Sequence, residues 1–278
     1  MGAVAAPDKP RRRHKPAWPQ RHGSTGFPLV AGVLAFVASL FFLIPLAGLL
    51  WRAPWSGLGG ELADRDVREA LRLSLVCSLS ATALSLAVGV PLAWVLARAE
   101  FPGRRLLRAL TTLPMVLPPV VGGVALLLAF GRNGLVGRWM GIQLPFTTAA
   151  AVLAETFVAM PFLVVAAEAG FRSADPRYEE AARTLGARPW TVFRRVTLPL
   201  VRPSLVAGGV LCWARALGEF GATITFAGNF PGRTQTTPLK VYLLLESRPD
   251  AAIALSLVLL AISLAVLVAL RDHWFPAA

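Results

Sequence analysis

Polar residues that could bind a partner or a ligand gather in two segments of an otherwise apolar sequence. Residues 179–199 read EEAARTLGARPWTVFRRVTLP and contain two glutamates and four arginines. Residues 214–242 read ARALGEFGATITFAGNFPGRTQTTPLKVY, in which Arg215 precedes Glu219 by four positions. Because residues four apart share a helix face, these two can form an ion pair. The neutral donors that follow, together with a fixed cation, suit a tetrahedral oxyanion, although an ordinary polar loop has a similar composition.

Three observations argue against an enzyme. His14, His22 and His273 lie outside the apolar runs, and no H-E-x-x-H pattern occurs, which excludes zinc-protease chemistry of that type. Glu155 and Glu168 would lie about 20 Å apart on one straight helix, too far for paired carboxylate chemistry, and are expected to be interfacial or helix-contact residues. No G-x-x-x-x-G-K-[ST] phosphate loop is present, so the chain is not expected to bind ATP by that motif.

The elements that must position the two polar segments are apolar. Hydrophobic residues make up 55% of the 278 residues and charged residues 15%, whereas roughly a quarter of the residues in soluble domains are charged. The net charge of +13 does not indicate nucleic-acid binding, because the basic residues lie between apolar runs instead of forming one stripe. Cys77 and Cys212 lie inside apolar runs, which is typical of small core residues and not of a disulfide framework or a metal cluster.

Six apolar runs are long enough to cross a membrane, whose ~30 Å hydrocarbon core needs ~20 residues of helix. They are residues 27–51, 70–97, 109–130, 149–171, 203–227 and 251–270. The sequence therefore predicts an all-α, polytopic membrane protein with about six transmembrane helices over residues 27–271. The first run exceeds the ~7–15 apolar residues of a signal-peptide core and is interpreted as a retained anchor, with a twin-arginine export signal as the alternative.

The third run contains LPMVLPPVVGG, residues 113–123, whose three prolines and two glycines interrupt or loosen helical hydrogen bonding. Irregular backbone inside a membrane is tolerated where protein or a water-filled cavity receives it. This run either lies beside a translocation pathway or is a kinked packing helix.

The distribution of lysine and arginine predicts the orientation, because these residues are retained on the cytoplasmic side. Eighteen of the 28 fall in one alternating set of tails and loops, nine fall in the other set, and Arg215 lies inside a span. Both termini are therefore predicted to be cytoplasmic. Residues 1–26 have the composition of a disordered basic tail, and residues 272–278 are expected to form a short C-terminal tail.

Residues 172–200 are predicted to form a cytoplasmic loop of two short helices. Asp175 can cap the first helix, Pro176 suits its first turn, and Gly186 can adopt the left-handed conformation that ends it. Pro189 can begin the second helix, before Leu198-Pro199 leads into the next span. One apolar face of the first helix is predicted from the spacing of Tyr178, Ala181, Ala182 and Leu185. Such an element is suited to bind a partner, or alternatively to lie on anionic lipid headgroups.

The loop also carries a recognisable spacing. Glu180-Ala181-Ala182, Gly186 and then Val196-x-Leu198-Pro199 resemble the EAA loop of the permease subunits of bacterial ABC importers, with valine in place of the commoner isoleucine. The resemblance implies a type I importer permease fold in the cytoplasmic membrane. It also implies that this loop docks on a separate ATPase subunit, with coupling roles for Glu180, Ala181, Ala182, Gly186, Leu198 and Pro199.

The same resemblance implies an assembly of two permease copies, two ATPase subunits and an extracytoplasmic solute-binding protein, embedded in membrane lipid. The ATPase subunits use ATP and Mg²⁺, and no cofactor is expected on this chain. The two permease copies alternate between inward-open and outward-open states.

The second polar segment points to a substrate. GEFGAT, FAGN and PGRTQT resemble the molybdate permeases of this family, in that Phe220, Ala222 and Thr223 match the molybdate form, whereas sulfate and thiosulfate permeases usually carry a GEYGS-like version. The resemblance implies molybdate import with a molybdate-binding protein, with tungstate, sulfate or thiosulfate as alternatives. A non-transport scaffold or an intramembrane enzyme is the alternative of a different class. Residues expected along the pathway or gate are Arg215, Glu219, Phe220, Thr223, Asn229, Arg233 and Thr234. For Arg215 and Glu219, purely internal pairing is the alternative, because charges inside a membrane should face protein or pore.

Overall fold

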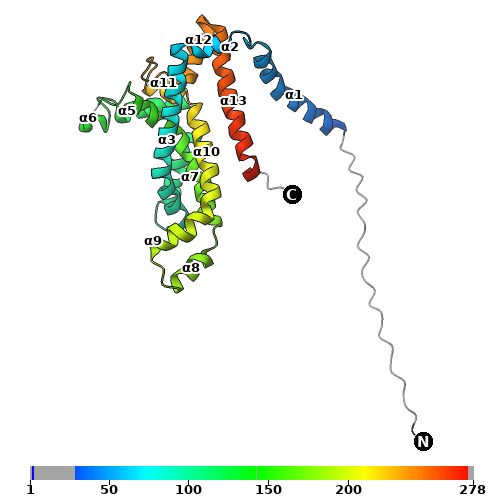
Figure 1. The fold of residues 1–278 in the computed structure, drawn as a ribbon. Helices are drawn as coiled ribbons and strands as arrows, with labels where there is room; N and C mark the ends of the chain where they lie inside the picture. Colours follow the sequence, from blue (N-terminus) through cyan, green and yellow to red (C-terminus); the bar gives the residue numbers. More distant parts are fainter. Residues whose placement is uncertain (1, 3–28, 142, 275–278) are drawn as a thin grey trace. The chain divides into compact units, whose positions relative to one another are not determined.

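The computed structural model describes residues 2, 29–141 and 143–274, and this part of the chain contains helices and no strand (Figure 1). Most of the predicted N-terminal tail and residues 275–278 of the predicted C-terminal tail lie outside the described residues. The chain divides into two units, Met1–Gly48 and Leu49–Ala278. The elements in chain order are α1 Leu29–Trp51, α2 Leu58–Ala63, α3 Arg65–Arg98, α4 Arg104–Val116, α5 Pro119–Phe130, α6 Gly137–Met140, α7 Thr148–Ser173, α8 Pro176–Thr184, α9 Pro189–Val192, the π-helical turn η1 Phe193–Thr197, α10 Leu198–Leu217, α11 Gly221–Phe226, α12 Thr237–Ser247 and α13 Pro249–Trp274.

Five helices in the described part of the chain are long and apolar enough to cross a membrane. They are α1, α3, α7, the continuous helix Pro189–Leu217 and the Pro249–Val268 portion of α13. Each of them overlaps one of the predicted spans. The predicted all-α, membrane-spanning fold class is therefore confirmed. The physical reason is that backbone N–H and C=O groups inside a membrane can all be hydrogen-bonded only in a helix or a closed barrel.

The prediction of one continuous span over residues 109–130 is wrong. The run is divided into α4 and α5, and the backbone between them is extended at Leu117 and Pro118. Pro118 disfavours helical backbone at the residue before it, and Pro119 favours the first turn of a new helix. The prolines therefore break the run into two helices, neither of which is as long as a full span.

The predicted span over residues 203–227 also differs from the structure. The helix ends at Leu217, and α11 begins separately at Gly221. The carboxylate of Glu219 accepts a hydrogen bond of 2.8 Å from the backbone N–H of Ala222 and so caps the start of α11. A charged residue in the expected middle of the span thus marks the end of one helix and the start of another.

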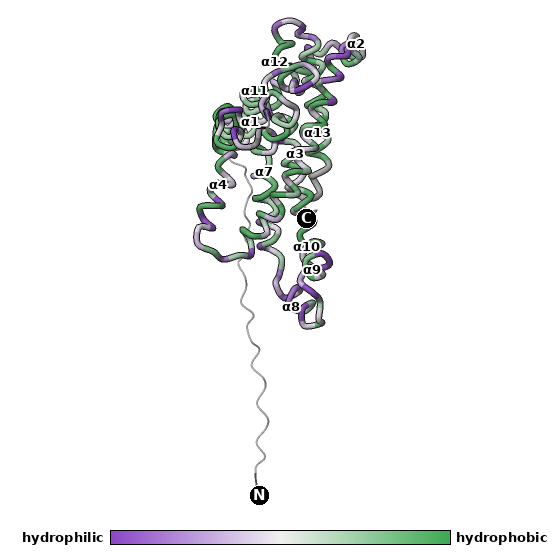
Figure 2. Tube along the Cα trace, turned by 90° about the vertical axis from the view of Figure 1, so that its left-hand side faces the viewer, coloured by the Kyte–Doolittle hydropathy of each residue, from purple (hydrophilic) through white to green (hydrophobic). Residues whose placement is uncertain are grey.

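Within Leu49–Ala278, α7 packs against both α3 and α10, and the three helices lie side by side (Figure 1). Small residues allow the close approach, as at Gly89 and Gly208, where an added Cβ would meet side chains of α7 at about 3 Å. Cys77 and Cys212 are buried and unpaired, as predicted for core cysteines. Figure 2 shows that hydrophobic residues dominate these helices, whereas hydrophilic residues gather near the ends of this unit, including α8.

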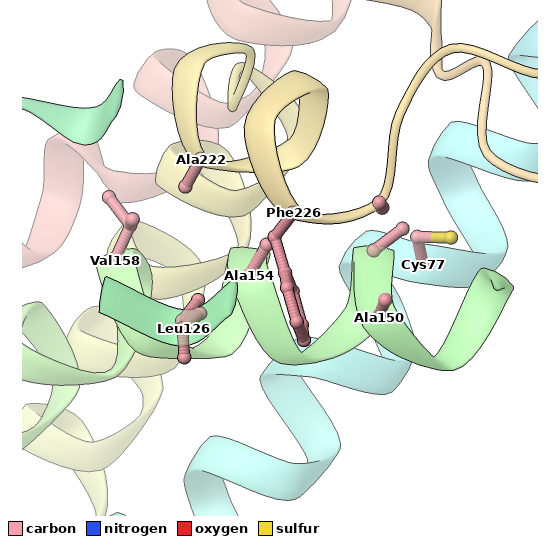
Figure 3. Packing of buried hydrophobic residues seen from close by; sticks show 9 residues of the cluster. Cys77, Leu126, Ala150, Ala154, Val158, Ala222 and Phe226 are labelled. Carbon is pink, nitrogen blue, oxygen red and sulfur yellow. The ribbon is translucent and has the colours of Figure 1, made fainter. Parts of the chain in front are cut away.

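The second half of the broken third run packs against α11. Leu126 of α5 lies in one buried cluster with Ala222 and Phe226 of α11, and Ala154 and Val158 of α7 complete the contact (Figure 3). Gly123 of α5 is so close to α11 that an added Cβ would come within 1.7 Å of Thr225 Oγ1. The break therefore places α5 tightly against the residues that follow Glu219.

Ion pairs join the start of α3 to the junction of α12 and α13. Arg248 donates hydrogen bonds of 2.6 Å to Asp64 and 2.6 Å to Glu61. The hydrogen bond from Arg248 lowers the pKa of the Asp64 carboxyl below its ordinary value of 3.8, and one from the backbone of Asp66 acts in the same direction. This end of the unit, which carries α2 and α12, lies opposite the end that carries α8 (Figure 1).

Candidate functional site

The first polar segment forms a helix and turn at one end of the α3, α7 and α10 bundle. Asp175 accepts a hydrogen bond of 2.9 Å from the backbone N–H of Arg177, which caps α8, and Pro176 occupies its first turn. Gly186 follows the helix with φ of +81°, in the left-handed region that favours glycine. The predicted capping and ending of this helix are confirmed.

The predicted second short helix is not separate. The helix that begins at Pro189 continues through η1 into α10 and ends only at Leu217. A proline in a helix interior clashes with the carbonyl four residues earlier, so Pro199 was expected to stand at a boundary. The π-helical turn over Phe193–Thr197 ends two residues before this proline and widens the backbone there, which lets the helix continue.

The outer face of α8 and the adjoining turn is exposed. Tyr178 is 60% exposed, Leu185 88% and Trp190 69%. Three of the four residues of the predicted apolar face, including Ala181, are therefore exposed, and only Ala182 is half-buried. Exposed large apolar side chains are typical of a surface that contacts another protein or a membrane. This surface, comprising Tyr178, Glu180, Ala181, Leu185 and Gly186, is named the docking surface below.

The predicted coupling residues do not all lie on the docking surface. Glu180, Ala181 and Gly186 are exposed, and Ala182 faces partly inward. Leu198 and Pro199 lie at the start of α10, beyond the π-helical turn. The structure thus separates the motif into an exposed part on α8 and a part that belongs to the helix of the span.

Sequence reasoning missed Glu179 as a site residue. Its Oε1 accepts hydrogen bonds of 3.1 Å from Arg98 Nη2 and 3.0 Å from Thr197 Oγ1. Its Oε2 lies 3.5 Å from Arg183 Nη2, one helical turn later. The available signal was the spacing of Glu179 and Ala182, three residues apart, which places both on one face of α8. That face is half-buried and turned toward the rest of the bundle.

A second carboxylate at this end of the bundle is held in a similar way. Glu168 of α7 accepts a hydrogen bond of 3.0 Å from Arg108 Nε, and Arg172 lies 3.8 Å from it. Arg104 and Arg108 also donate to the carbonyl of Leu96, near the end of α3, where a cation complements the helix dipole. The expectation that Glu168 is a helix-contact residue is confirmed.

In the second polar segment, Arg215 and Glu219 form the predicted ion pair at 2.7 Å. Glu219 is 1% exposed and lies in the break between α10 and α11, so its carboxylate holds both the arginine and the first turn of α11. Phe220 packs against Tyr242 with ring centroids 5.4 Å apart. Thr223 is fully buried, and its hydroxyl has no hydrogen-bond partner among the described residues.

The polar groups after α11 fold their own loop. Thr234 Oγ1 accepts a hydrogen bond of 2.9 Å from the backbone N–H of Phe230, and Gln235 Nε2 donates to Asn229 Oδ1 at 3.0 Å. Arg233 is exposed, and its carbonyl accepts a hydrogen bond from Thr148. The structure pairs Arg215 with Glu219 and orders the loop around Thr234, but it does not gather all seven residues into one site. Their role along a pathway stays a prediction.

Comparison with known proteins places the chain in a transport family. The family described as "Binding-protein-dependent transport system inner membrane component" matches residues 89–275. The molybdenum transport system permease protein ModB of Mycobacterium tuberculosis is 48% identical over 245 residues, covering 87% of this chain and 93% of the relative. ModB of Escherichia coli is 43% identical over 210 residues, covering 74% and 92%. The sulfate permease CysT of Escherichia coli is 37% identical over 249 residues, covering 87% and 90%.

Solved structures agree with this placement at the level of the fold. A chain of a bacterial alginate ABC transporter, solved with an alginate-bound periplasmic protein, matches with a TM-score of 0.70 at 18% identity, covering 86% of this chain and 91% of that one. A chain of the MetNI methionine ABC transporter matches with a TM-score of 0.53 at 21% identity, covering 75% and 94%. This chain is a multi-pass membrane protein, and it belongs to the family of binding-protein-dependent transport system inner membrane components.

Proposed function

We propose that this chain is the permease subunit of an ATP-driven importer that carries molybdate across the membrane by alternating access. The observation that carries the proposal is the docking surface at the end of the α3, α7 and α10 bundle. Its exposed tyrosine and leucine lie between the membrane-spanning helix α7 and the membrane-spanning helix that begins at Pro189. A soluble subunit that binds this surface and changes conformation can therefore move two spans together.

The partner at the docking surface is an ATPase subunit, as the resemblance to the EAA loop implies, and it is a separate chain because the sequence of this chain contains no phosphate loop. That subunit uses ATP and Mg²⁺, and no cofactor is assigned to this chain. The functional assembly contains two permease copies and two ATPase subunits. Closure of the ATPase subunits on each other moves the two docked loops and switches the permease copies between inward-open and outward-open states.

The orientation follows from the same assignment. The α8 end faces the cytoplasm, in agreement with the excess of lysine and arginine in the loops assigned to that side. Both termini are then cytoplasmic. The opposite end, which carries α2 and α12, receives the extracytoplasmic binding protein that delivers the anion to a cavity between the two permease copies.

Molybdate is the proposed anion because the relatives named as molybdenum permeases are more similar to this chain than the sulfate permease is, with 48% and 43% identity against 37%. Tungstate has nearly the same size and charge and is expected to be carried as well. Sulfate import is the second candidate, and the similarity to CysT over 87% of this chain is the observation that favours it.

The test is transport by the complete complex. The permease, its ATPase and the binding protein encoded with them are reconstituted in proteoliposomes, and uptake of molybdate, tungstate and sulfate is measured with and without ATP. ATP-dependent molybdate uptake that excess sulfate does not inhibit supports the proposal. Sulfate uptake without molybdate uptake would assign the chain to the second candidate, and uptake that needs no ATP would overturn both.

A further inference from the structure

Two membrane-spanning helices contact the carboxylate of Glu179, and the end of a third contacts the arginine that binds it. Arg98, which donates to it at 3.1 Å, is the last residue of α3. The same Arg98 Nη2 lies 3.4 Å from the carbonyl of Ala174, the residue that ends α7. Thr197, which donates to it at 3.0 Å, is the last residue of η1 and is continuous with α10. Glu179 itself belongs to α8, the helix that carries much of the docking surface.

Packing contributes little to holding α8 in place. No residue of α8 is buried within the described part of the chain. Because hydrophobic stabilisation scales with the apolar area removed from water, a helix with no buried residue is only weakly held by its apolar side chains. Helix α8 is connected covalently to α7 and α9. In the described part of the chain, its long-range side-chain hydrogen bonds are those of Glu179 with Arg98 and Thr197.

The environment of Glu179 strengthens these contacts. Its side chain is 14% exposed and that of Arg98 is 23% exposed, so solvent screens this pair less than an ordinary surface ion pair. Hydrogen bonds to an ionised acceptor are stronger than those between neutral groups. Glu179 also lies in the first turn of α8, where the helix dipole favours a negative charge. The carboxylate therefore forms a charged contact that can transmit force.

Glu180, its neighbour, is placed differently. It is the glutamate that matches the EAA spacing, it is exposed, and it makes no ion pair among the described residues. The two adjacent glutamates therefore differ in their surroundings, one half-buried against this chain and the other exposed. One is available to a partner subunit, and the other is bonded to this chain's own spans.

We propose that Glu179 is a positioning residue that transmits movement of the docking surface to α3 and α10 through Arg98 and Thr197. This inference rests on the proposed function, because it needs an ATPase that moves the loop. When the ATPase shifts α8, the shared carboxylate moves the end of α3 and the start of α10 with it. Without the carboxylate, α8 can still bind the ATPase but is connected to the spans only through the backbone on either side of it.

The test uses the complete complex in proteoliposomes, with molybdate and the binding protein. Glu179→Gln removes the charge but keeps an acceptor for Thr197, Arg98→Gln removes the other partner, and Thr197→Val removes the hydroxyl at constant shape. Glu100→Gln and Arg105→Gln are matched controls, because both residues are exposed and form no ion pair in the described chain. The measured quantities are co-purification of the ATPase, stimulation of ATP hydrolysis by the loaded binding protein, and molybdate imported per ATP hydrolysed.

We expect Glu179→Gln and Arg98→Gln to retain the ATPase, while stimulation and molybdate imported per ATP fall by about five-fold or more, the lower range of coupling between sites. Thr197→Val should lower both the stimulation of ATP hydrolysis and the molybdate imported per ATP, by a smaller factor. The double variant Glu179→Gln/Arg98→Gln should lose no more stimulation and no more molybdate imported per ATP than the more impaired of its two single variants, because both changes remove the same contact. The two controls should match the wild type.

Several results would overturn the inference. One is wild-type stimulation of ATP hydrolysis in Glu179→Gln, and another is fully additive losses in the double variant. A third is loss of ATPase co-purification in Glu179→Gln, which would show that Glu179 maintains the structure of the docking surface. If Glu179→Gln does not assemble in the membrane, Thr197→Val decides, and an unchanged import ratio there counts against the inference. Failure of the proposed function is distinct, since the wild-type chain would then neither retain the ATPase nor show stimulated hydrolysis.

Discussion

Glu219 lies just beyond the end of α10 and forms an ion pair of 2.7 Å with Arg215, one helical turn earlier, while its other oxygen caps α11. One buried carboxylate therefore connects two helices that hydropathy alone would join into one span. The pair is internal to the chain, which agrees with the interpretation of Arg215 and Glu219 as structural partners and is also compatible with a position beside the pathway.

Glu219→Ala is expected to lower stability by about 2–3 kcal/mol, because it leaves the arginine without its partner and the start of α11 without its cap. Glu219→Gln should lower it less, since the amide oxygen can still accept from Ala222. The measurement is the apparent melting temperature of the purified chain in detergent. Glu246→Ala is the control, as Glu246 is exposed and unpaired in the described chain. An equal effect of the alanine and glutamine variants would show that the cap contributes nothing.

Gly186→Ala should weaken binding of the ATPase subunit. The φ of +81° at this position costs a residue with a Cβ about 1–2 kcal/mol, although no atom lies within 4 Å of an added Cβ. The turn should therefore shift, and docking should weaken by up to roughly ten-fold. Gly209→Ala is the control, because its backbone is helical and an added Cβ would meet only Leu86 at 3.9 Å. Wild-type ATPase affinity in Gly186→Ala would contradict the expected role of the turn.

Leu185→Ser tests the docking surface directly. Leu185 is 88% exposed, so the change should leave the free energy of unfolding of the isolated chain within about 0.5 kcal/mol of wild type. A leucine that anchors an interface contributes more than about 1 kcal/mol to binding, so ATPase co-purification should fall clearly if Leu185 is such an anchor. Leu135→Ser, at a residue 71% exposed in the turn before α6, should leave co-purification unchanged. Equal behaviour of the two serine variants would argue against docking at α8.

The Arg248 contacts predict a dependence on pH. Because the folded-state pKa of Asp64 is lowered, its contribution to stability is present above the ordinary value of 3.8 and is lost as the pH falls through the lower folded value. Arg248→Gln removes the largest cause of this shift. Wild type and variant should therefore differ in protection of the α2–α3 region at neutral pH and converge in strong acid, as measured by hydrogen exchange. A difference that persists unchanged below the folded pKa would contradict this assignment.

Local features were predictable from the sequence. Five of the six apolar runs correspond to helices long enough to cross a membrane. Asp175 and Gly186 mark the start and the end of α8 as expected, and Arg215 pairs with Glu219. Each of these depends on residues within a few positions of one another or on the length of an apolar run. The chemistry of backbone capping, helix periodicity and hydrophobicity is sufficient to predict them.

Other features depend on contacts between distant segments. Arg98 lies 81 residues before Glu179, and Arg108 lies 60 residues before Glu168, so only the packing of α3 and α4 against α7 brings these charges together. The hydroxyl of Thr234 was expected along a pathway, but the folded loop uses it to bind its own backbone. The sequence by itself determined most of the apolar spans, the two ends of α8 and the family resemblance, because these arise from neighbouring residues. Only the tertiary structure decided which glutamate binds the spans and which faces outward, because that depends on where the packed helices place their partners.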